Sequence, residues 1–319
     1  MKKFTCIDDL IQSRGLHQAL ADAADVKQDP WKYEQSGRRK TLGLLFMNPS
    51  LRTRMSTEKA ARLLGMETIT LNAGSDSWSL ETRDGVIMDG NNTEHIKDAA
   101  AVMGRYCDIL GIRTFAGLQD RDGDYREEIL ESFTSYADVP VISLESATRH
   151  PLQSFADLIT IEEHRPQHRP RVVLTWAPHP KALPQAVANS FTEWMRHADV
   201  DLVVTNPEGY DLAPEFINGV EVLHDQHEAL KGADFVYAKN WSSYSNYGQV
   251  LSSDRSWTVT EEKMSLTNDA KFMHCLPVRR NMIVTDAVID GPNSIVLDEA
   301  ANRVVSAQVV LLNILRGMA

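Results

Sequence analysis

Apolar runs typical of buried strands alternate along the chain with segments whose apolar residues recur every three or four positions. The first pattern predicts strands covered on both sides, and the second predicts helices with one buried face. In the N-terminal half these segments are KTLGLLF (40–46), STEKAARLLGM (56–66), METITLN (66–72), DAAAVMGRYCDILGIR (98–113), PVISLES (140–146) and QSFADLITIEEH (153–164). Alternating strands and helices are typical of parallel α/β sheets.

The C-terminal half repeats this alternation. Its segments are PRVVLTWAP (170–178), ALPQAVANSFTEWMRH (182–197), DVDLVVTNP (199–207), VEVLHD (220–225), QHEALKGADFVYAKN (226–240), AKFMHCLP (270–277), NSIVLDE (293–299) and a last helix over 300–317. A helix over 150–164 bridges the halves, and the basic stretch 164–171 leads into the second sheet. We therefore predict an α/β fold class with two doubly wound parallel-sheet domains joined by helices.

Composition narrows the class of protein. The 319 residues include 44 acidic and 33 basic side chains, and this net charge of −11 argues against general nucleic-acid binding. Three widely spaced cysteines indicate reduced thiols in a cytosolic setting. Because the sequence has no apolar leader and no apolar stretch approaching about twenty residues, we expect a cytoplasmic protein that does not bind membranes.

Ligands of open parallel sheets bind outside the carboxyl ends of the strands, where loops and helix N-termini gather. These ends hold most of the chemically capable side chains of the chain. They are MNPSLRTRMS (47–56), IRTFAG (112–117), LESATRHPLQ (144–153), TWAPHP (175–180), YAKNWSSY (237–244) and HCLPVRR (274–280). We expect a small-molecule site there.

The stretch SLRTR (50–54) predicts a phosphate site. Pro49 ends a strand and a helical period follows, so the stretch lies at a helix N-terminus, which favours anions. The hydroxyls of Ser50 and Thr53 add donors, and Arg52 can hold two oxygens at once. The alternative is an ordinary N-cap at Ser50 with arginines on a solvated face.

Nucleotide-binding motifs are absent from the sequence. No GxxxxGK[ST] loop is present, and TWAPHP, the first turn of the second sheet, lacks the glycines of a dinucleotide fingerprint. An NAD-linked dehydrogenase with twin α/β domains is therefore a weak alternative. A non-catalytic anion-binding regulatory protein is a second alternative.

Three motifs, in order, carry a resemblance that covers essentially the whole chain. SLRTR resembles the Ser-x-Arg-Thr-Arg phosphate motif of the aspartate and ornithine carbamoyltransferases, and HPLQ (150–153) and HCLP (274–277) resemble two further motifs of that family. TRHPLQSFADLITIEE, TWAPHP, YAKNW and FMHCLPVRRNMIVTD are similar to its branch that carbamoylates N-acylated ornithine in arginine biosynthesis. The resemblance implies a homotrimer with no metal or organic cofactor.

The resemblance also implies two domains with separate ligands. The carbamoyl phosphate-binding domain would comprise residues 1–148 and 300–319, and the N-acylornithine-binding domain residues 149–299. Because HPLQ and HCLP handle the reacting carbon rather than the phosphate, they favour an enzyme over the regulatory alternative.

Carbamoyl phosphate is an acyl phosphate, and the resemblance assigns it a set of contacts. The catalytic residues would be His150, Arg113 and Cys275, with His150 and Arg113 facing the developing oxyanion. The full set of expected carbamoyl phosphate contacts is Ser50, the Leu51 backbone, Arg52, Thr53, Trp78, Arg113, His150, Gln153, Cys275, the Leu276 carbonyl and Arg303. Trp78 would come from the neighbouring subunit. We expect Cys275 to orient the amine, because transfer from an activated acyl phosphate needs no covalent intermediate.

Several of these residues have plainer interpretations. Arg113 would be a surface loop arginine, His150 a structural histidine, Trp78 a core residue, and Arg303 a charge on a helix surface. The resemblance favours the functional interpretation of each.

The second substrate would be an N-acylated ornithine, because the DxxxSMG motif that binds the charged amine of free ornithine is missing from AKNWSSYSNYGQ (238–249). The resemblance assigns its contacts to Glu145, His179, Lys239 and Arg279, with Lys239 suited to a carboxylate and Glu145 to the nitrogen end. The plainer interpretation of Glu145, His179 and Lys239 is that each is an ordinary surface polar residue.

Thr93 bears on the acyl group. In acetyl-using relatives a glutamate occupies this position, and its charge would repel a succinyl carboxylate. We therefore expect N-succinylornithine as the substrate, with N-acetylornithine as the alternative. Thr93 also has a plainer interpretation as the N-cap of the helix that follows it.

Overall fold

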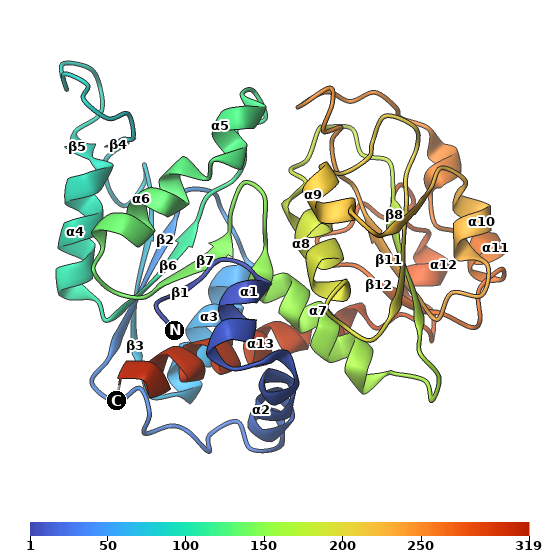
Figure 1. Cartoon of the computed structure of the whole chain (residues 1–319), viewed down its shortest axis with the longest axis horizontal. Coiled ribbons are helices and arrows are strands. Elements are labelled where there is room, and N and C mark those ends of the chain that lie inside the picture. The colour runs from blue at the N-terminus through green and yellow to red at the C-terminus, as the bar shows by residue number, and fades with distance from the viewer. Residues whose placement is uncertain (319) are drawn as a thin grey trace. The chain divides into compact units, whose positions relative to one another are not determined.

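The computed structural model describes residues 1–318, which divide into two compact units (Figure 1). Unit 1 comprises Met1–Ala116, Asp122–Leu152 and the chain from Arg303 onward, and unit 2 comprises Gly117–Arg121 and Gln153–Asn302. The division falls inside two long helices, α7 (Pro151–Glu163) and α13 (Val296–Met318). The assignment of one ligand to each domain stays a prediction.

Unit 1 is built on a five-stranded, all-parallel sheet in the order β1-β7-β6-β2-β3. Its strands are β1 (Lys3–Phe4), β2 (Thr41–Phe46), β3 (Glu67–Asn72), β6 (Ile109–Arg113) and β7 (Val141–Glu145). The helices are α1 (Ile7–Ser13), α2 (Leu16–Gln28), α3 (Arg52–Leu63), α4 (Ile96–Tyr106), α6 (Glu128–Tyr136) and, at the border with unit 2, α5 (Arg121–Tyr125). A separate two-stranded sheet pairs β4 (Leu80–Glu81) with β5 (Glu94–His95).

Unit 2 has a second five-stranded parallel sheet in the order β10-β9-β8-β11-β12. Its strands are β8 (Arg171–Trp176), β9 (Asp201–Thr205), β10 (Glu221–Leu223), β11 (Phe235–Lys239) and β12 (Lys271–Met273). Its helices are α8 (Ala186–Met195), α9 (Pro214–Ile217), α10 (Gln226–Leu230), the short 3₁₀ helix η1 (Arg255–Trp257), α11 (Glu261–Met264) and α12 (Asp286–Ile289). Two parallel sheets flanked by helices confirm the predicted fold class.

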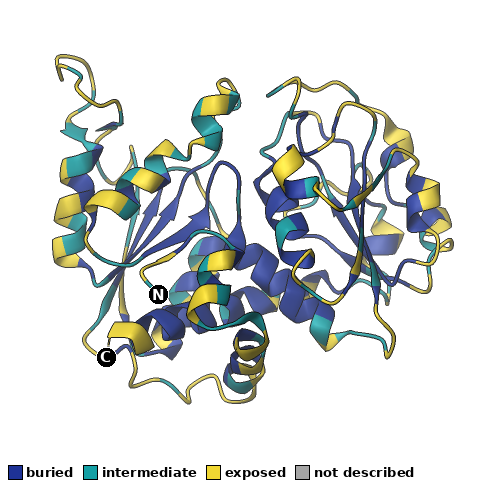
Figure 2. Ribbon diagram, in the orientation of Figure 1, coloured by how far each residue is buried: buried dark blue, intermediate teal, exposed yellow. Residues whose placement is uncertain are grey.

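Burial explains why these segments form central strands. Every residue of β6 and β7 is buried, as is all of β2 after its first residue, whereas the edge strand β3 is half-exposed. Figure 2 shows the same contrast between buried strands and helices that expose one face. In residues 1–318 no helix is long and apolar enough to cross a bilayer.

Both sheets reverse their strand order at one point. The reversal determines where the loops with the expected site residues leave each sheet. In unit 1 the chain runs from β2 to β3 on one side and returns to β6 on the other side of β2. In unit 2 it runs from β8 through β9 to β10 and returns to β11 beside β8. At each reversal, the loops that follow two neighbouring strands leave in opposite directions and open a crevice at the carboxyl ends of those strands. This crevice is the usual ligand position in open parallel sheets.

The sequence-based prediction missed some elements. It named none before residue 40. There the buried face of α2 has small or moderately sized apolar residues, Ala19, Ala23 and Val26, and includes the charged Asp22, so it is too weakly apolar to stand out. The apolar segment NSIVLDE is not a separate element, because α13 begins inside it at Val296 and only Ser294 bridges to β12.

Candidate active site

The stretch SLRTR lies where predicted, between the end of β2 and the first turn of α3. Helix α3 begins at Arg52 with Leu51 as its N-cap, and the Thr53 N–H donates to the Ser50 hydroxyl at 3.3 Å. The N–H groups of a first turn have no carbonyl partner within their own helix, so this end of α3 favours an anion. Ser50 thus caps the helix in part, as the plainer interpretation held. Arg54 pairs with Glu58 one turn on, and Arg52 is half-buried.

Two arginines from distant parts of the sequence converge on Thr53. Arg113, the last residue of β6, donates from Nη1 to the Thr53 Oγ1 at 3.3 Å, and Arg303 of α13 donates from Nη2 to the same oxygen at 2.5 Å. A hydroxyl has two acceptor positions and one proton. Because both acceptor positions are occupied, the Thr53 hydroxyl has only its proton left to offer to a ligand.

Glu145 and His150 complete this group, which we call the Thr53 cluster (Thr53, Arg113, Glu145, His150 and Arg303). Glu145, at the end of β7, pairs with Arg113 at 2.6 Å, and the His150 Nε2 lies 3.5 Å from both the Glu145 carboxylate and the Arg303 guanidinium. All five side chains are buried, and Arg303 is only 6% exposed. Arg303 is therefore not the helix-surface charge, nor Arg113 the surface loop residue, that the plainer interpretations held.

The charge of the Thr53 cluster is informative. Two permanently charged guanidinium groups share it with a single carboxylate. Guanidinium groups present several N–H donors in a planar arrangement that matches carboxylate and phosphate oxygens. The cluster is therefore suited to an anion with several oxygens at the N-terminus of α3.

The loop between Glu145 and His150 is held by one carboxylate that sequence reasoning missed. Glu127, the N-cap of α6, accepts from the Thr148 N–H at 2.8 Å, the Ala147 N–H at 3.1 Å, and the hydroxyls of Thr148 and Ser146 at 2.5 and 2.6 Å. Glu127 has a left-handed backbone with a φ of 53°. Its sequence neighbours are charged and exposed, and no pattern distinguishes it from a surface residue.

Trp78 and Thr93, which the sequence analysis assigned to different ligands, lie just before the paired strands β4 and β5 of unit 1. The Trp78 indole N–H donates to Glu94 at 2.7 Å, and the Thr93 N–H donates to the Ser79 carbonyl at 3.2 Å. Trp78 is 53% exposed, so the interpretation as a core residue is wrong. The interpretation of Thr93 as an N-cap is also wrong, because α4 begins at Ile96 and is capped by the His95 ring.

In unit 2, the order reversal brings His179 and Lys239 to neighbouring strand ends. Arg279 donates from Nε to the His179 Nε2 at 2.9 Å. Burial lowers the pKa of His179, and the positive charges of Arg279 and Lys239 act in the same direction. We therefore assign a neutral ring whose Nδ1 proton is donated to the Lys181 carbonyl at 2.9 Å. This ring orients the Arg279 side chain.

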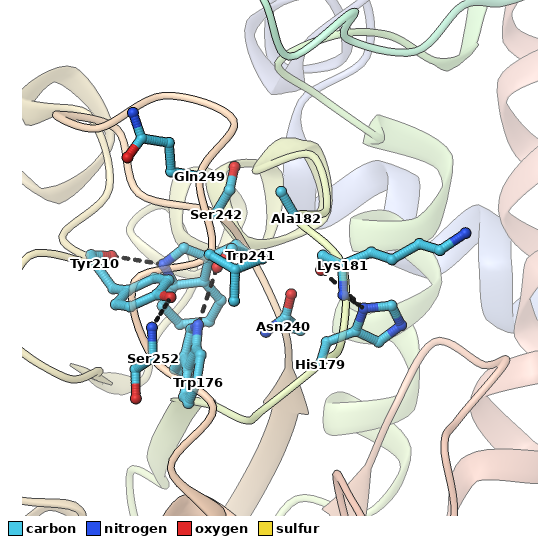
Figure 3. Close-up of a pocket in the computed structure, with 11 residues that line it drawn as sticks. Trp176, His179, Lys181, Ala182, Tyr210, Asn240, Trp241, Ser242, Gln249 and Ser252 are labelled. Atoms are coloured by element: carbon cyan, nitrogen blue, oxygen red, sulfur yellow. Dashed lines mark hydrogen bonds between the residues drawn. The ribbon is translucent and has the colours of Figure 1, made fainter.

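A small pocket beside His179 is bounded by aromatic side chains, as Figure 3 shows. The Trp176 indole donates to the Trp241 carbonyl, the Trp241 indole donates to the Tyr210 carbonyl, and the Tyr210 hydroxyl accepts from the N–H groups of Leu251 and Ser252. Asn240 lies between this aromatic group and His179 with Lys181. The segment that replaces DxxxSMG is thus tied to β8 through Trp176 and to the loop after β9 through Tyr210.

The remaining expected residues of unit 2 lie around the end of β12. Gln153 is fully buried on α7, and Cys275 is half-buried just past β12. Leu276 has a φ of 52°, an uncommon value for a branched residue, and is followed by a cis peptide bond to Pro277. Within residues 1–318 no group of three or more His, Cys, Asp or Glu side chains is arranged to hold a metal ion.

Comparison with known protein families agrees with this geometry. The family model described as "Aspartate/ornithine carbamoyltransferase, carbamoyl-P binding domain" matches residues 2–163, and that described as "Aspartate/ornithine carbamoyltransferase, Asp/Orn binding domain" matches residues 184–314. The chain therefore belongs to the aspartate/ornithine carbamoyltransferase family, as its motifs predicted.

Similarity to individual members of the family gives more detail than the family models do. The chain is 58% identical to the N-succinylornithine carbamoyltransferase of Bacteroides thetaiotaomicron, over 100% of both chains. It is 39% identical to the N-acetylornithine carbamoyltransferase of Xanthomonas campestris, over 90% of each. A solved structure of an N-acetyl-L-ornithine transcarbamylase mutant, complexed with carbamyl phosphate and N-succinyl-L-norvaline, is similar with a TM-score of 0.91 at 37% identity. That match covers 98% of this chain and 99% of the other.

Replacing Glu127 by Gln tests its hold on the loop before His150. The amide keeps the size of the carboxylate but faces several donors with a donor of its own. We expect the free energy of unfolding to fall by about 1–3 kcal/mol, the usual cost of leaving buried donors unpaired. Urea denaturation and hydrogen exchange at the Thr148 amide measure the effect.

Glu128→Gln is the matched control, because Glu128 forms only an exposed ion pair with Arg126. Its loss should change the stability little. Equal stabilities and equal Thr148 exchange rates in the two variants would contradict the role of Glu127.

Proposed function

We propose that this chain transfers the carbamoyl group of carbamoyl phosphate to the δ-amine of N2-succinyl-L-ornithine, giving N-succinylcitrulline and phosphate in arginine biosynthesis. The observation that carries the proposal is the convergence of Arg113 and Arg303 on the Thr53 hydroxyl at the start of α3. Identity of 58% with an N-succinylornithine carbamoyltransferase supports it.

The phosphate would be bound by the first turn of α3. Ser50, Thr53 and the N–H groups from Leu51 onward would surround its oxygens, and Arg52 would contribute a bidentate contact. The two guanidinium groups of the Thr53 cluster support this assignment, since their N–H donors suit phosphate oxygens.

The carbonyl oxygen would be polarised by Arg113, His150 and the proton of Thr53. As the amine attacks, negative charge grows on this oxygen, and donors already in place lower the barrier because they need not reorganise. The buried positions of these groups support the role. The carbamoyl NH₂ would donate to the Gln153 side-chain oxygen and to the Leu276 carbonyl.

The reaction then needs only a neutral amine at the correct distance. A bond forms between the δ-nitrogen and the carbonyl carbon, the bond from that carbon to the phosphate oxygen breaks, and the departing phosphate takes the surplus amine proton. Cys275 would orient the amine without forming a covalent bond. Positioning and electrostatic preorganisation supply the catalysis.

The acylornithine would be held by charged side chains. Lys239 and Arg279 suit its carboxylates, and His179 holds Arg279 in place. Glu145 suits the nitrogen end, and its ion pair with Arg113 links that contact to the carbonyl-polarising group.

Thr93 would select the acyl group. Mutants of N-acetyl-L-ornithine transcarbamylase with one glutamate replaced by alanine, serine, valine or proline crystallise with N-succinyl-L-norvaline, a succinylated compound. Loss of one negative charge is therefore compatible with a succinyl group in that protein. Thr93 brings no charge to the position at which acetyl-using relatives carry a glutamate.

The active unit would be a homotrimer. Trp78 is half-exposed, and Ile87 and Met88, in the loop between β4 and β5, are exposed as well. A neighbouring subunit would cover this surface, and Trp78 would close over the phosphate of that neighbour. No metal or organic cofactor is required by the proposed chemistry.

Assay of ureido product from carbamoyl phosphate distinguishes the candidate functions. We expect product with N-succinylornithine, less with N-acetylornithine, and none with ornithine or aspartate. Preference for N-acetylornithine would favour the alternative substrate. Binding of carbamoyl phosphate without turnover of any amine would instead favour a non-catalytic anion-binding protein.

Replacing Thr93 by Glu tests the origin of the acyl preference. The new carboxylate would repel the succinyl carboxylate and leave the acetyl group unaffected, so the ratio of kcat/KM for succinyl over acetyl substrate should fall by about tenfold or more. Thr93→Gln, of the same size without charge, is the control. A ratio that stays constant in Thr93→Glu would exclude Thr93 as the selecting residue.

A further inference from the structure

The side-chain amide of Gln153 is held in one orientation by two acidic residues. Its Nε2 donates to the Asp157 Oδ1 at 2.8 Å and to the Glu299 Oε1 at 3.1 Å. Both amide protons are therefore used, and the amide nitrogen must face the two acids, because a flipped amide would direct its oxygen at a carboxylate. The orientation of Gln153 follows from its neighbours.

The other end of this amide has no partner. The Gln153 Oε1 is buried, accepts no hydrogen bond within the described part of the chain, and belongs to a side chain with 0% exposure. An unpaired buried acceptor is costly. A ligand that brings an N–H donor would remove that cost.

The two acids form one buried pair. Asp157 and Glu299 are 0% and 1% exposed, and Glu299 hydrogen-bonds to Asp157. Burial raises the pKa of Glu299 well above its ordinary value, and the negative charge of Asp157 raises it further. Tyr237 and Cys275 also face the pair, and burial raises the pKa of the Tyr237 phenol as well. One proton shared by the two acids, on the Glu299 side, accounts for these contacts.

Glu299 also holds the start of the HCLP segment. Its Oε2 accepts from the His274 N–H at 2.9 Å, and the His274 Nδ1 accepts from the Leu276 N–H at 2.8 Å. Because Oε2 acts as the carbonyl oxygen, Oε1 carries the acid proton toward Asp157 while its lone pair receives the Gln153 amide. One acid thus contacts the two segments that bear Gln153 Oε1 and the Leu276 carbonyl.

We propose that Glu299 is a positioning residue: as a neutral acid it orients Gln153 and the 274–276 segment so that two acceptors receive the NH₂ group of carbamoyl phosphate. This inference rests on the proposed function and adds residues that its motifs do not include. It assigns Glu299 and Asp157 to recognition of the carbamoyl NH₂, separately from the phosphate contacts of unit 1.

Acetyl phosphate, which has a methyl group in place of this NH₂, tests the inference directly. Calorimetric dissociation constants for carbamoyl phosphate and acetyl phosphate give a preference ratio. In the unmodified chain we expect carbamoyl phosphate to bind about tenfold more tightly, the value of an ordinary hydrogen bond. In Glu299→Gln the new amide faces the Gln153 amide with a donor, so the preference should fall to near one while acetyl phosphate binds as before.

Glu163→Gln is the matched control, because Glu163 lies at the end of α7, ten residues after Gln153, and accepts from Asn302 of α13. Its preference ratio should equal that of the unmodified chain. Should Glu299→Gln fail to fold, Asp157→Asn replaces the other acceptor of Gln153 and is expected to lower the same ratio.

The outcomes separate this inference from the proposed function. A wild-type preference ratio in folded Glu299→Gln would overturn the inference, and so would an equal loss of affinity for both ligands, which indicates general damage. An unmodified chain that forms ureido product but shows no preference between the ligands would also overturn the inference while the proposed function stood. An unmodified chain that binds neither acyl phosphate would contradict both.

Discussion

The shared hydrogen bonding of Arg113 and Arg303 to one buried hydroxyl, Thr53, is the constraint on which the proposed site depends. The two guanidinium groups come from β6 and α13, and they meet at the first turn of α3. Each guanidinium group presents several N–H donors, and their geometry suits the oxygens of a phosphate or carboxylate. The geometry therefore favours a phosphate compound before any residue at the reacting carbon is considered.

The order reversal of each sheet makes this convergence possible. In unit 1 it places the loop after β2, with SLRTR, beside Arg113 at the end of β6, where Phe46 and Arg113 lie opposite each other in register. In unit 2 the same reversal pairs Trp176 with Lys239 and brings His179 to the same edge. One topological feature, used twice, supplies one set of site residues in each unit.

The sequence allowed the fold class and the expected site residues to be predicted, for identifiable reasons. Short apolar runs such as TLGLLF and RVVLTW mark central strands, because burial on both faces favours continuous apolar residues and the runs are too short for a buried helix. SLRTR, HPLQ and HCLP lie at strand ends, where a pattern can be read locally. The burial of Arg303 could not be read from its exposed-looking neighbours, since it follows from the packing of α13 against distant segments.

The residues that position the site could not be predicted either, because their roles also depend on contacts with distant segments. Glu127 and Glu299 act through contacts with segments that lie 19 residues or more away, and Asp157 and Glu299 form a pair of acids that only the fold brings together. An acidic residue inside an apolar helix, as Asp157 is in QSFADLIT, was the one available signal. Its meaning depends on a partner 142 positions along the chain, 299 minus 157.

The most direct measurement of the central interaction is the affinity of carbamoyl phosphate for Thr53→Val, by calorimetry, with Thr53→Ser as the control that keeps the hydroxyl. Valine preserves the shape of the side chain but removes the group on which both arginines converge. The account predicts binding at least about tenfold weaker in Thr53→Val, the worth of a charge-assisted hydrogen bond, and near-normal binding in Thr53→Ser. Equal affinity of Thr53→Val and the unmodified chain would contradict it.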